Sequence, residues 1–226
     1  MLKRIKRFVV RDVLRKGHPA RFHGSASYWD ERYRRKGTSG AGSYGRLAMF
    51  KAEVVNRVIV DFDASSVVEW GCGDGAQLGL IEVADYTGVD VSPEAIRLCR
   101  DRYTGDPTKR FLTLDEALEH RPRGDVSLSL DVVYHLVEDE VYERYMRRLF
   151  ESADRTVIVY SSNHEDPPTQ SGRSPHIRHR RFTDWVEQHA EGWEFHEHIP
   201  NPYPRDSNDP ANTSFADFHI FTCSAP

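Results

Sequence analysis

The stretch that decides the fold is Val-Val-Glu-Trp-Gly-Cys-Gly-Asp-Gly at residues 67–75. Its apolar start predicts a short buried strand. The three glycines that follow predict a turn in which the backbone comes close to a ligand. Asp90 lies at the end of the next predicted strand, roughly 20 residues further on. A strand, a glycine turn and a later acidic residue indicate a nucleotide cofactor at the carboxyl edge of a parallel sheet.

Strands and helices alternate on both sides of this motif. We expect strands at residues 66–70, 86–91, 110–114, 125–130, 155–160, 194–199 and 216–223. We expect helices at residues 46–61, from about 76, from 92, at 138–151 and at 182–190, and loops at 24–45 and 161–180. This order predicts an α/β, Rossmann-like, doubly wound sheet of about seven strands with helices on both faces. The sheet should be mostly parallel with an antiparallel edge strand, because no helix separates the last two strands.

The 226 residues carry a net charge of -4 and are 38% hydrophobic, which predicts one domain over residues 24–226. Residues 1–23 form a basic arm, in which 2–15 fit an amphipathic helix. That helix could dock on its own domain, on a second subunit of a homodimer, or on an anionic membrane surface. No apolar run is long enough to span a membrane and no secretory signal is visible, so a cytoplasmic location is expected. The acidic balance disfavours a nucleic-acid partner.

The glycine spacing distinguishes between nucleotide cofactors. The motif reads G-x-G-x-G, whereas a dinucleotide site favours G-x-G-x-x-G around a pyrophosphate. Glu69 lies two residues before Gly71, where a carboxylate would repel a pyrophosphate but attract a cationic amine. This favours S-adenosylmethionine, with the Asp90 carboxylate accepting hydrogen bonds from its ribose.

Residues 69–75 resemble the first motif of the class I S-adenosylmethionine-dependent methyltransferases, and residues 87–92 resemble the second. The resemblance extends over about residues 27–160, with Leu114-Asp115 similar to the third-strand acidic position and 125–135 to the fourth-strand motif. It implies that the cofactor is bound by Gly71, Gly73, Asp90, Val91, Asp115 and Leu130. In that assignment Asp115 receives the adenine amine; the alternative is a helix N-cap.

The segment Tyr28-Trp29-Asp30-Glu31-Arg32-Tyr33 resembles a part of these enzymes that closes over the cofactor. Trp29 would then pack on the cofactor and Arg46 would meet its carboxylate. An ordinary aromatic cluster between helix and sheet is the other interpretation.

Asp131 and His135 directly follow the fourth predicted strand, where the active site of such a fold opens. At a spacing of four they share a face of any helical turn, so His135 could be a general base oriented by Asp131. The spacing also partly resembles the Glu-x-x-Glu-His segment of ubiquinone-pathway O-methyltransferases. A Mg²⁺ ion held by Asp131, His135 and His164 is therefore a second hypothesis, although Tyr134 replaces the inner carboxylate. His135 as a packing or capping residue is a third.

The acceptor side is rich in His and Arg over residues 161–181. We expect Tyr134, His164 and Arg181 to contact the acceptor, unless the charged loop is simply solvated. The polar loops favour a polar small molecule or a glycan as the acceptor. Residues 39–51 and 131–141 resemble segments of bacterial methyltransferases that act in polysaccharide biosynthesis, and this resemblance implies O-methylation of a sugar or glycan hydroxyl. A quinone or phenol-type O- or N-methyltransferase and a non-catalytic cofactor-binding regulator are the alternatives.

Overall fold

The computed structural model describes residues 22–165 and 174–223, and a seven-stranded sheet organises them. The strands are β1 (Ser66–Trp70), β2 (Asp85–Asp90), β3 (Lys109–Thr113), β4 (Gly124–Leu130), β5 (Ala153–Ser161), β6 (Trp193–Ile199) and β7 (Asp217–Cys223). Their order across the sheet is β3-β2-β1-β4-β5-β7-β6. The chain reverses this order after β3, and the carboxyl ends of β1 and β4 become neighbours there.

The first five strands pair in parallel, whereas β7 pairs antiparallel with both β5 and β6. The predicted fold class is therefore confirmed, with β7 as the reversed strand beside the outermost strand, β6. Because β7 is reversed, its first residue, Asp217, pairs with the last residue of β5, Ser161. The connection 200–216 is thereby placed at the carboxyl edge of the sheet.

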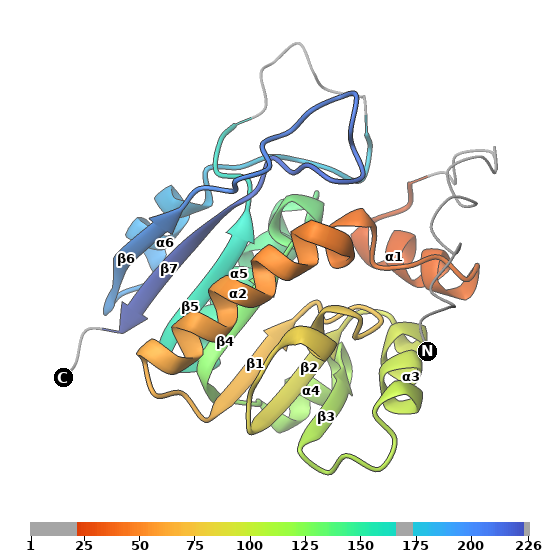
Figure 1. Ribbon diagram of the computed structural model, residues 1–226, viewed down its shortest axis with the longest axis horizontal. Helices are drawn as coiled ribbons and strands as arrows, with labels where there is room; N and C mark the ends of the chain where they lie inside the picture. Colours follow the sequence, from red (N-terminus) through yellow and green to blue (C-terminus); the bar gives the residue numbers. More distant parts are fainter. Residues whose placement is uncertain (1–21, 166–173, 224–226) are drawn as a thin grey trace, which may run out of the picture.

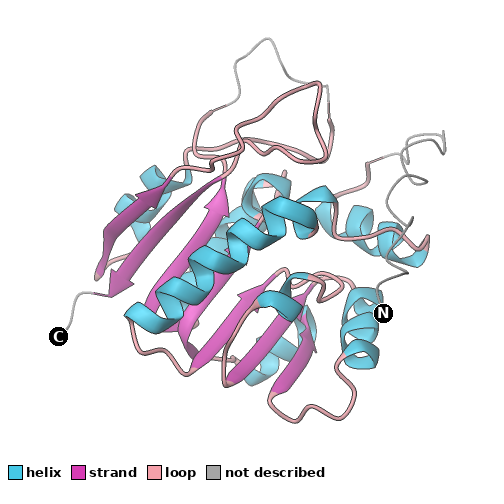
Figure 2. Cartoon of the chain, in the orientation of Figure 1, coloured by secondary structure: helices cyan, strands magenta, loops and turns pink. Residues whose placement is uncertain are grey.

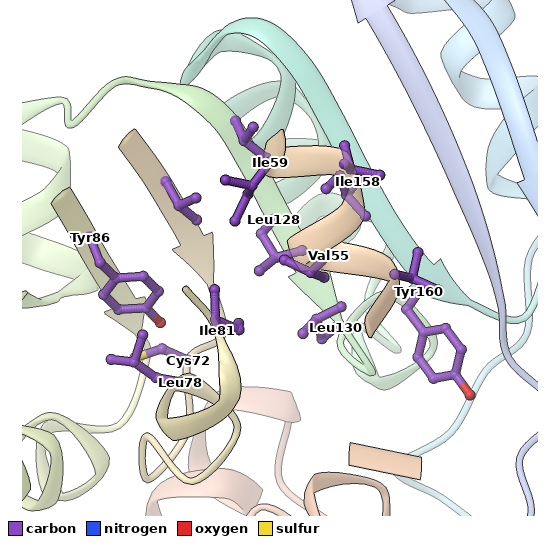
Figure 3. Packing of buried hydrophobic residues seen from close by; sticks show 14 of the residues in the cluster. Val55, Ile59, Cys72, Leu78, Ile81, Tyr86, Leu128, Leu130, Ile158 and Tyr160 are labelled. Carbon is purple, nitrogen blue, oxygen red and sulfur yellow. The ribbon is translucent and has the colours of Figure 1, made fainter. Parts of the chain in front are cut away.

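Helices cover both faces of the sheet (Figure 1; Figure 2). One face carries α2 (Gly45–Asp61), the short 3-10 helix η3 (Gln77–Leu80) and α3 (Pro93–Arg102). The other carries α4 (Leu114–His120), α5 (Asp139–Glu151) and α6 (Phe182–His189). Figure 3 shows how α2 fits the sheet: Val55 and Ile59 point at the strand residues Leu128 and Ile158.

Residues 24–45 do not form the predicted loop throughout. Ser25–Arg34 is the helix α1, and the 3-10 helix η2 occupies Ala41–Ser43. Residues of other elements stabilise α1. The backbone N–H and the hydroxyl of Ser25 donate to Glu138, and the Ser92 hydroxyl donates to Asp30. Tertiary contacts thus form a helix that its weak apolar pattern did not indicate.

The helix predicted from residue 76 is reduced to η3, because β2 begins at Asp85 and leaves no room for more turns. The helix α4 was expected only in the alternative interpretation of Asp115 as a helix N-cap, and it is present in the structure. Thr113 caps that helix in a capping box with Glu116. Asp115 is therefore not the N-cap and lies exposed in the first turn.

The predicted amphipathic helix at residues 2–15 lies outside the described residues. Within 22–165 and 174–223, no helix has the length and apolar character needed to cross a bilayer.

Candidate active site

A cavity of about 310 Å³ opens at the carboxyl edge of the sheet, between the glycine turn and α1. The turn after β1, the ends of β2 and β4, and the helices α1, α2 and α5 contribute its walls. Nine of the residues singled out in the sequence line it: Trp29, Glu69, Gly71, Gly73, Asp90, Val91, Leu130, Asp131 and His135.

The glycine turn has no room for side chains. Gly71 has φ 86°, and a Cβ there would lie 2.4 Å from Val132 Cγ2. Gly73 has φ 57°, and a Cβ there would lie 2.3 Å from Ser39 Oγ. The left-handed backbone and the close packing both require glycine. The turn therefore presents bare backbone to the cavity, as close approach of a ligand needs.

Asp90 holds this turn from the end of β2. One carboxylate oxygen accepts the Gly73 N–H at 2.9 Å and the other accepts the Ser92 N–H at 2.8 Å. Burial raises the pKa of Asp90 to about 6, and these backbone hydrogen bonds partly oppose that rise. Each oxygen keeps a lone pair for a further donor, such as a ribose hydroxyl.

Glu69 lies beneath the same turn. Its carboxylate accepts a hydrogen bond from the Tyr86 hydroxyl inside the core. Burial raises the pKa of Glu69 to about 7, partly offset by this bond and by the Lys51 ammonium. Glu69 is therefore poised to ionise near neutral pH, and its negative charge would attract a cationic group in the cavity.

Asp131 follows β4 in a left-handed conformation, with φ 60°. Its carboxylate is engaged on both oxygens: Lys51 Nζ lies 2.7 Å from Oδ2, and the Tyr134 hydroxyl donates to Oδ1 at 2.8 Å. No hydrogen bond joins Asp131 to His135 in the described part of the chain. Asp131 thus pairs with Lys51 instead of orienting the histidine as the sequence suggested.

His135 ends the 3-10 helix η4 (Val133–His135) and reaches the cavity beside Trp29, with ring centroids 4.8 Å apart. Its Nδ1 lies 2.9 Å from the backbone oxygen of His176. A carbonyl only accepts, so Nδ1 carries the proton and Nε2 keeps its lone pair. Burial lowers the pKa of His135 to about 4, so the ring is neutral at physiological pH.

Comparison with known proteins agrees with this geometry. Residues 68–157 match the family model described as a methyltransferase domain. Part of this chain is thus similar to a methyltransferase domain. Over 60 residues it is 37% identical to a Mycobacterium tuberculosis protein provisionally named as the methyltransferase Rv1506c. That alignment covers 25% of this chain and spans only 36% of the length of the curated relative.

Solved methyltransferase structures share the fold of this chain. The N-methyltransferase NodS of Bradyrhizobium japonicum WM9, in complex with S-adenosyl-L-homocysteine, has a TM-score of 0.64 at 12% identity, over 89% of this chain and 100% of that one. Magnesium protoporphyrin IX methyltransferase of Synechocystis PCC 6803 has a TM-score of 0.62 at 15% identity, over 88% and 98%. The methyltransferase domain of bacterial CtHen1 has a TM-score of 0.60 at 21% identity, over 80% and 100%.

Arg46 is not among the residues that line the cavity. Its Nε donates to the Asn212 carbonyl at 2.7 Å, and its guanidinium lies 4.4 Å from the centroid of the Tyr203 ring. An ion pair with Asp209 at 3.3 Å completes these contacts. Arg46 therefore fastens the 200–216 connection to α2, and this position does not support its predicted role at the cofactor carboxylate.

The other predicted contacts also lie outside the cavity lining. Asp115 is exposed beside Leu114, which does line it. Tyr134 is buried behind Asp131. His164 is exposed and packs on His179, and Arg181 is exposed near Asp184. Their predicted contacts with cofactor or acceptor remain predictions that these positions do not favour.

The Mg²⁺ hypothesis gains no support from the side-chain arrangement. Across residues 22–165 and 174–223, no group of three or more His, Cys, Asp and Glu side chains could hold a metal ion. The Asp131 carboxylate already binds Lys51 and Tyr134.

Several polar residues of the site were not anticipated. Ser39 donates to Asp74 at 2.9 Å and lies 3.0 Å from the Tyr33 hydroxyl, which ties α1 and the following loop to the glycine turn. Lys51 lies on the buried face of α2, at helical spacing from Leu47 and Val55. A lysine on an otherwise apolar helix stripe was the sequence signal that could have revealed it.

Proposed function

We propose that this protein transfers the methyl group of S-adenosylmethionine to a hydroxyl oxygen, and that His135 receives the proton that this oxygen loses. The observation that carries the proposal is the fixed tautomer of His135 at the wall of the cofactor cavity. The hydroxyl specificity goes beyond the methyltransferase domain itself and is our inference.

The residues that line the cavity fit the cofactor in their chemistry. When bound, S-adenosylmethionine supplies a methyl group on a positively charged sulfur, which is electrophilic without help from the protein. Gly71 and Gly73 would face its methionine part, Asp90 its ribose, and Val91 its adenine. Val91 is 38% exposed and lines the cavity, so its side chain is available for such packing.

His135 can act without strong basicity. A hydroxyl becomes strongly acidic as its oxygen forms a bond to the methyl carbon, so a weak neutral base is sufficient at that stage. The His176 carbonyl keeps the proton on Nδ1, which leaves Nε2 free to accept. In the described part of the chain, Nε2 makes no hydrogen bond. The role of His135 is thus to remove a proton during or after carbon–oxygen bond formation.

We favour a sugar or glycan hydroxyl as the acceptor. Trp29 and His135 line the cavity, and aromatic faces pack well on the C–H groups of a sugar ring. Ser25 at the same wall offers a polar contact. A phenolic hydroxyl is the second candidate, because the same rings could stack on a planar acceptor.

A transfer assay tests the proposal. The protein is incubated with methyl-labelled S-adenosylmethionine and a panel of methyl glycosides, oligosaccharides and simple phenols. We expect labelled methyl ethers of the sugars. If only the phenols become labelled, as methyl aryl ethers, a phenolic hydroxyl replaces the sugar hydroxyl as the favoured acceptor. Bound cofactor with no transfer to any acceptor would favour a non-catalytic, cofactor-binding protein.

The role of His135 is tested separately. We expect His135→Gln to reduce kcat at least about 100-fold with unchanged S-adenosylhomocysteine affinity. His189→Gln is the matched control, because His189 Nδ1 also lies 2.9 Å from a backbone oxygen, that of Trp185, but His189 is not among the residues that line the cavity. Equal turnover of both variants would remove His135 from the mechanism.

A further inference from the structure

The most unusual charge in the cavity belongs to Lys51. Its side chain is only 1% exposed, although lysine is almost never fully buried without a functional or structural partner. Lys51 lines the cavity, and its one ion pair in the described part of the chain is with Asp131. The ammonium also lies 5.5 Å from the centroid of the Tyr160 ring.

The hydrogen-bonding capacity of Lys51 is not filled. An ammonium has three N–H donors, and one of them is used by Asp131 Oδ2 at 2.7 Å. The other two have no acceptor among residues 22–165 and 174–223. Unpaired donors of a buried cation are costly, so the site is built to receive a negatively charged or strongly accepting group.

Asp131 supplies the opposite charge at the same place. The Tyr134 hydroxyl and Lys51 fix its two oxygens, and its backbone is held at φ 60°, which is uncommon outside glycine. Adjacent positive and negative charges in fixed positions are complementary to an amino-acid zwitterion, which carries an ammonium and a carboxylate on one carbon.

We propose that Lys51 and Asp131 form a clamp for the amino-acid end of S-adenosylmethionine, with Lys51 binding its carboxylate and Asp131 facing its ammonium. The proposal rests on the proposed function, because it assumes that this cofactor occupies the cavity. It gives Lys51 the role that the sequence suggested for Arg46.

The other cations of the cavity fit this role less well. Arg144 and Arg148 line it from α5, on the opposite face of the sheet from Lys51. Arg46 is engaged by the 200–216 connection. Lys51 alone pairs with Asp131 and also acts on Glu69, whose backbone leads directly into the glycine turn.

The test compares two ligands that differ at the amino-acid end. S-adenosylhomocysteine has the amino acid, whereas 5′-deoxy-5′-methylthioadenosine lacks it. Both are titrated calorimetrically into wild type, Lys51→Met and Arg46→Met. Arg46→Met is the matched control, since it removes a cation from the same helix.

We expect Lys51→Met to lower the affinity for S-adenosylhomocysteine about 30-fold or more, the usual effect of removing one member of a buried charge pair. The affinity for methylthioadenosine should be unchanged. Arg46→Met should bind both ligands as wild type does. The proposal is overturned if Lys51→Met keeps wild-type affinity for S-adenosylhomocysteine, or if it weakens both ligands equally.

A second variant keeps the test decisive if Lys51→Met does not fold with Asp131 left unpaired. The double variant Lys51→Met/Asp131→Asn removes both charges, and we expect the same selective loss of S-adenosylhomocysteine binding. Failure of the wild type to bind S-adenosylhomocysteine at all would instead contradict the proposed function.

Discussion

At the residue scale, the cavity places ionisable groups where water is scarce. Glu69 is 3% exposed and Asp90 is 7% exposed, and burial raises the pKa of both. Hydrogen bonds from the protein offset part of the cost of burying each carboxylate. Glu69 accepts one from Tyr86, and Asp90 accepts them from backbone N–H groups. Their charge near neutral pH therefore depends on what enters the cavity.

The raised pKa of Glu69 predicts a pH-dependent cofactor affinity. Because this pKa rises from 4.5 to about 7, the carboxyl is mostly neutral at about pH 6 and mostly ionised at about pH 8. The ionised form attracts the cofactor ammonium, so S-adenosylhomocysteine should bind severalfold more tightly at the higher pH. Calorimetric titrations across this range measure the effect. Glu69→Gln should flatten the profile, and a wild-type profile without slope would contradict the prediction.

The two requirements on the glycine turn can be separated. Gly105 has φ 87°, like Gly71, but nothing lies within 4 Å of a Cβ built there. We expect Gly105→Ala to lower the free energy of unfolding by about 1 kcal/mol through backbone strain alone. Gly71→Ala should lower it by a further ~1–3 kcal/mol, because its methyl group meets Val132.

Cofactor binding distinguishes the same two variants. Of the two variants, only Gly71→Ala should weaken the binding of S-adenosylhomocysteine, because Gly71 lines the cavity and Gly105 does not. Denaturant unfolding and calorimetry report the two effects, and equal losses in both variants would show that strain alone matters.

Residue roles were predictable where the residue and its partner lie close in sequence. Asp90 and the glycines form one local motif, and the structure brings them together. Arg46 was expected at the cofactor carboxylate from the family resemblance. Its partners in the structure lie some 160 positions away and give no local signal in the sequence. Lys51 was overlooked because residues 46–61 were interpreted by their apolar spacing alone, and the lysine that interrupts this apolar stripe was not considered.

At the scale of elements, α1 closes one wall of the cavity through a few polar contacts. The Ser25 hydroxyl donates to the Glu138 carboxylate at 2.6 Å, and the Ser25 hydroxyl oxygen accepts the Val137 N–H at 3.2 Å. The Ser92 hydroxyl donates to Asp30 at 2.9 Å. Its apolar contribution is small, since only Ser25 and Tyr33 of the helix are buried. The attachment of α1 therefore depends on hydrogen bonds.

This dependence predicts that Ser25→Ala loosens α1. The change leaves the Val137 N–H without its acceptor and should cost about 1–3 kcal/mol locally. Amide hydrogen exchange in residues 25–34 should accelerate, and S-adenosylhomocysteine should dissociate faster. Ser27→Ala is the control, because the exposed Ser27 hydroxyl bonds only to the Gly24 carbonyl. Similar exchange in the two variants would contradict the assigned attachment.

Elements were predictable from sequence where apolar periodicity is strong. The seven expected strands all occur, and each strand end lies within two residues of its expected position. The α1 helix was missed because its side chains are mostly polar and its stability comes from Glu138, more than a hundred residues later. The short α4 was expected only as an alternative, with Asp115 as its N-cap, because β3 runs directly into a capping box that begins at Thr113.

At the scale of the whole molecule, two apolar cores flank the sheet and meet the cavity at its carboxyl edge. A ligand that binds there stabilises only the folded chain. At 100 times its dissociation constant, S-adenosylhomocysteine should add about 2.7 kcal/mol to the free energy of unfolding. Denaturant titration with and without ligand measures this shift.

Magnesium or a chelator should leave that shift unchanged. Among residues 22–165 and 174–223, no group of three or more His, Cys, Asp and Glu side chains could hold a metal ion, so we expect ligand binding to be independent of magnesium. A ligand-induced shift that disappears on chelation would require a metal site that the described residues do not contain.

The reversed direction of β7 also affects how such a protein can diversify. The 200–216 connection joins two neighbouring antiparallel strands, so insertions or deletions within it do not disturb the register of the parallel strands. Phe215 reaches Tyr134 from this connection, with ring centroids 4.8 Å apart. Relatives with a 200–216 connection of different length could therefore keep the cofactor cavity intact while the surface beside it changes. The 200–216 connection is for this reason the natural segment to graft when the range of acceptors is to be altered.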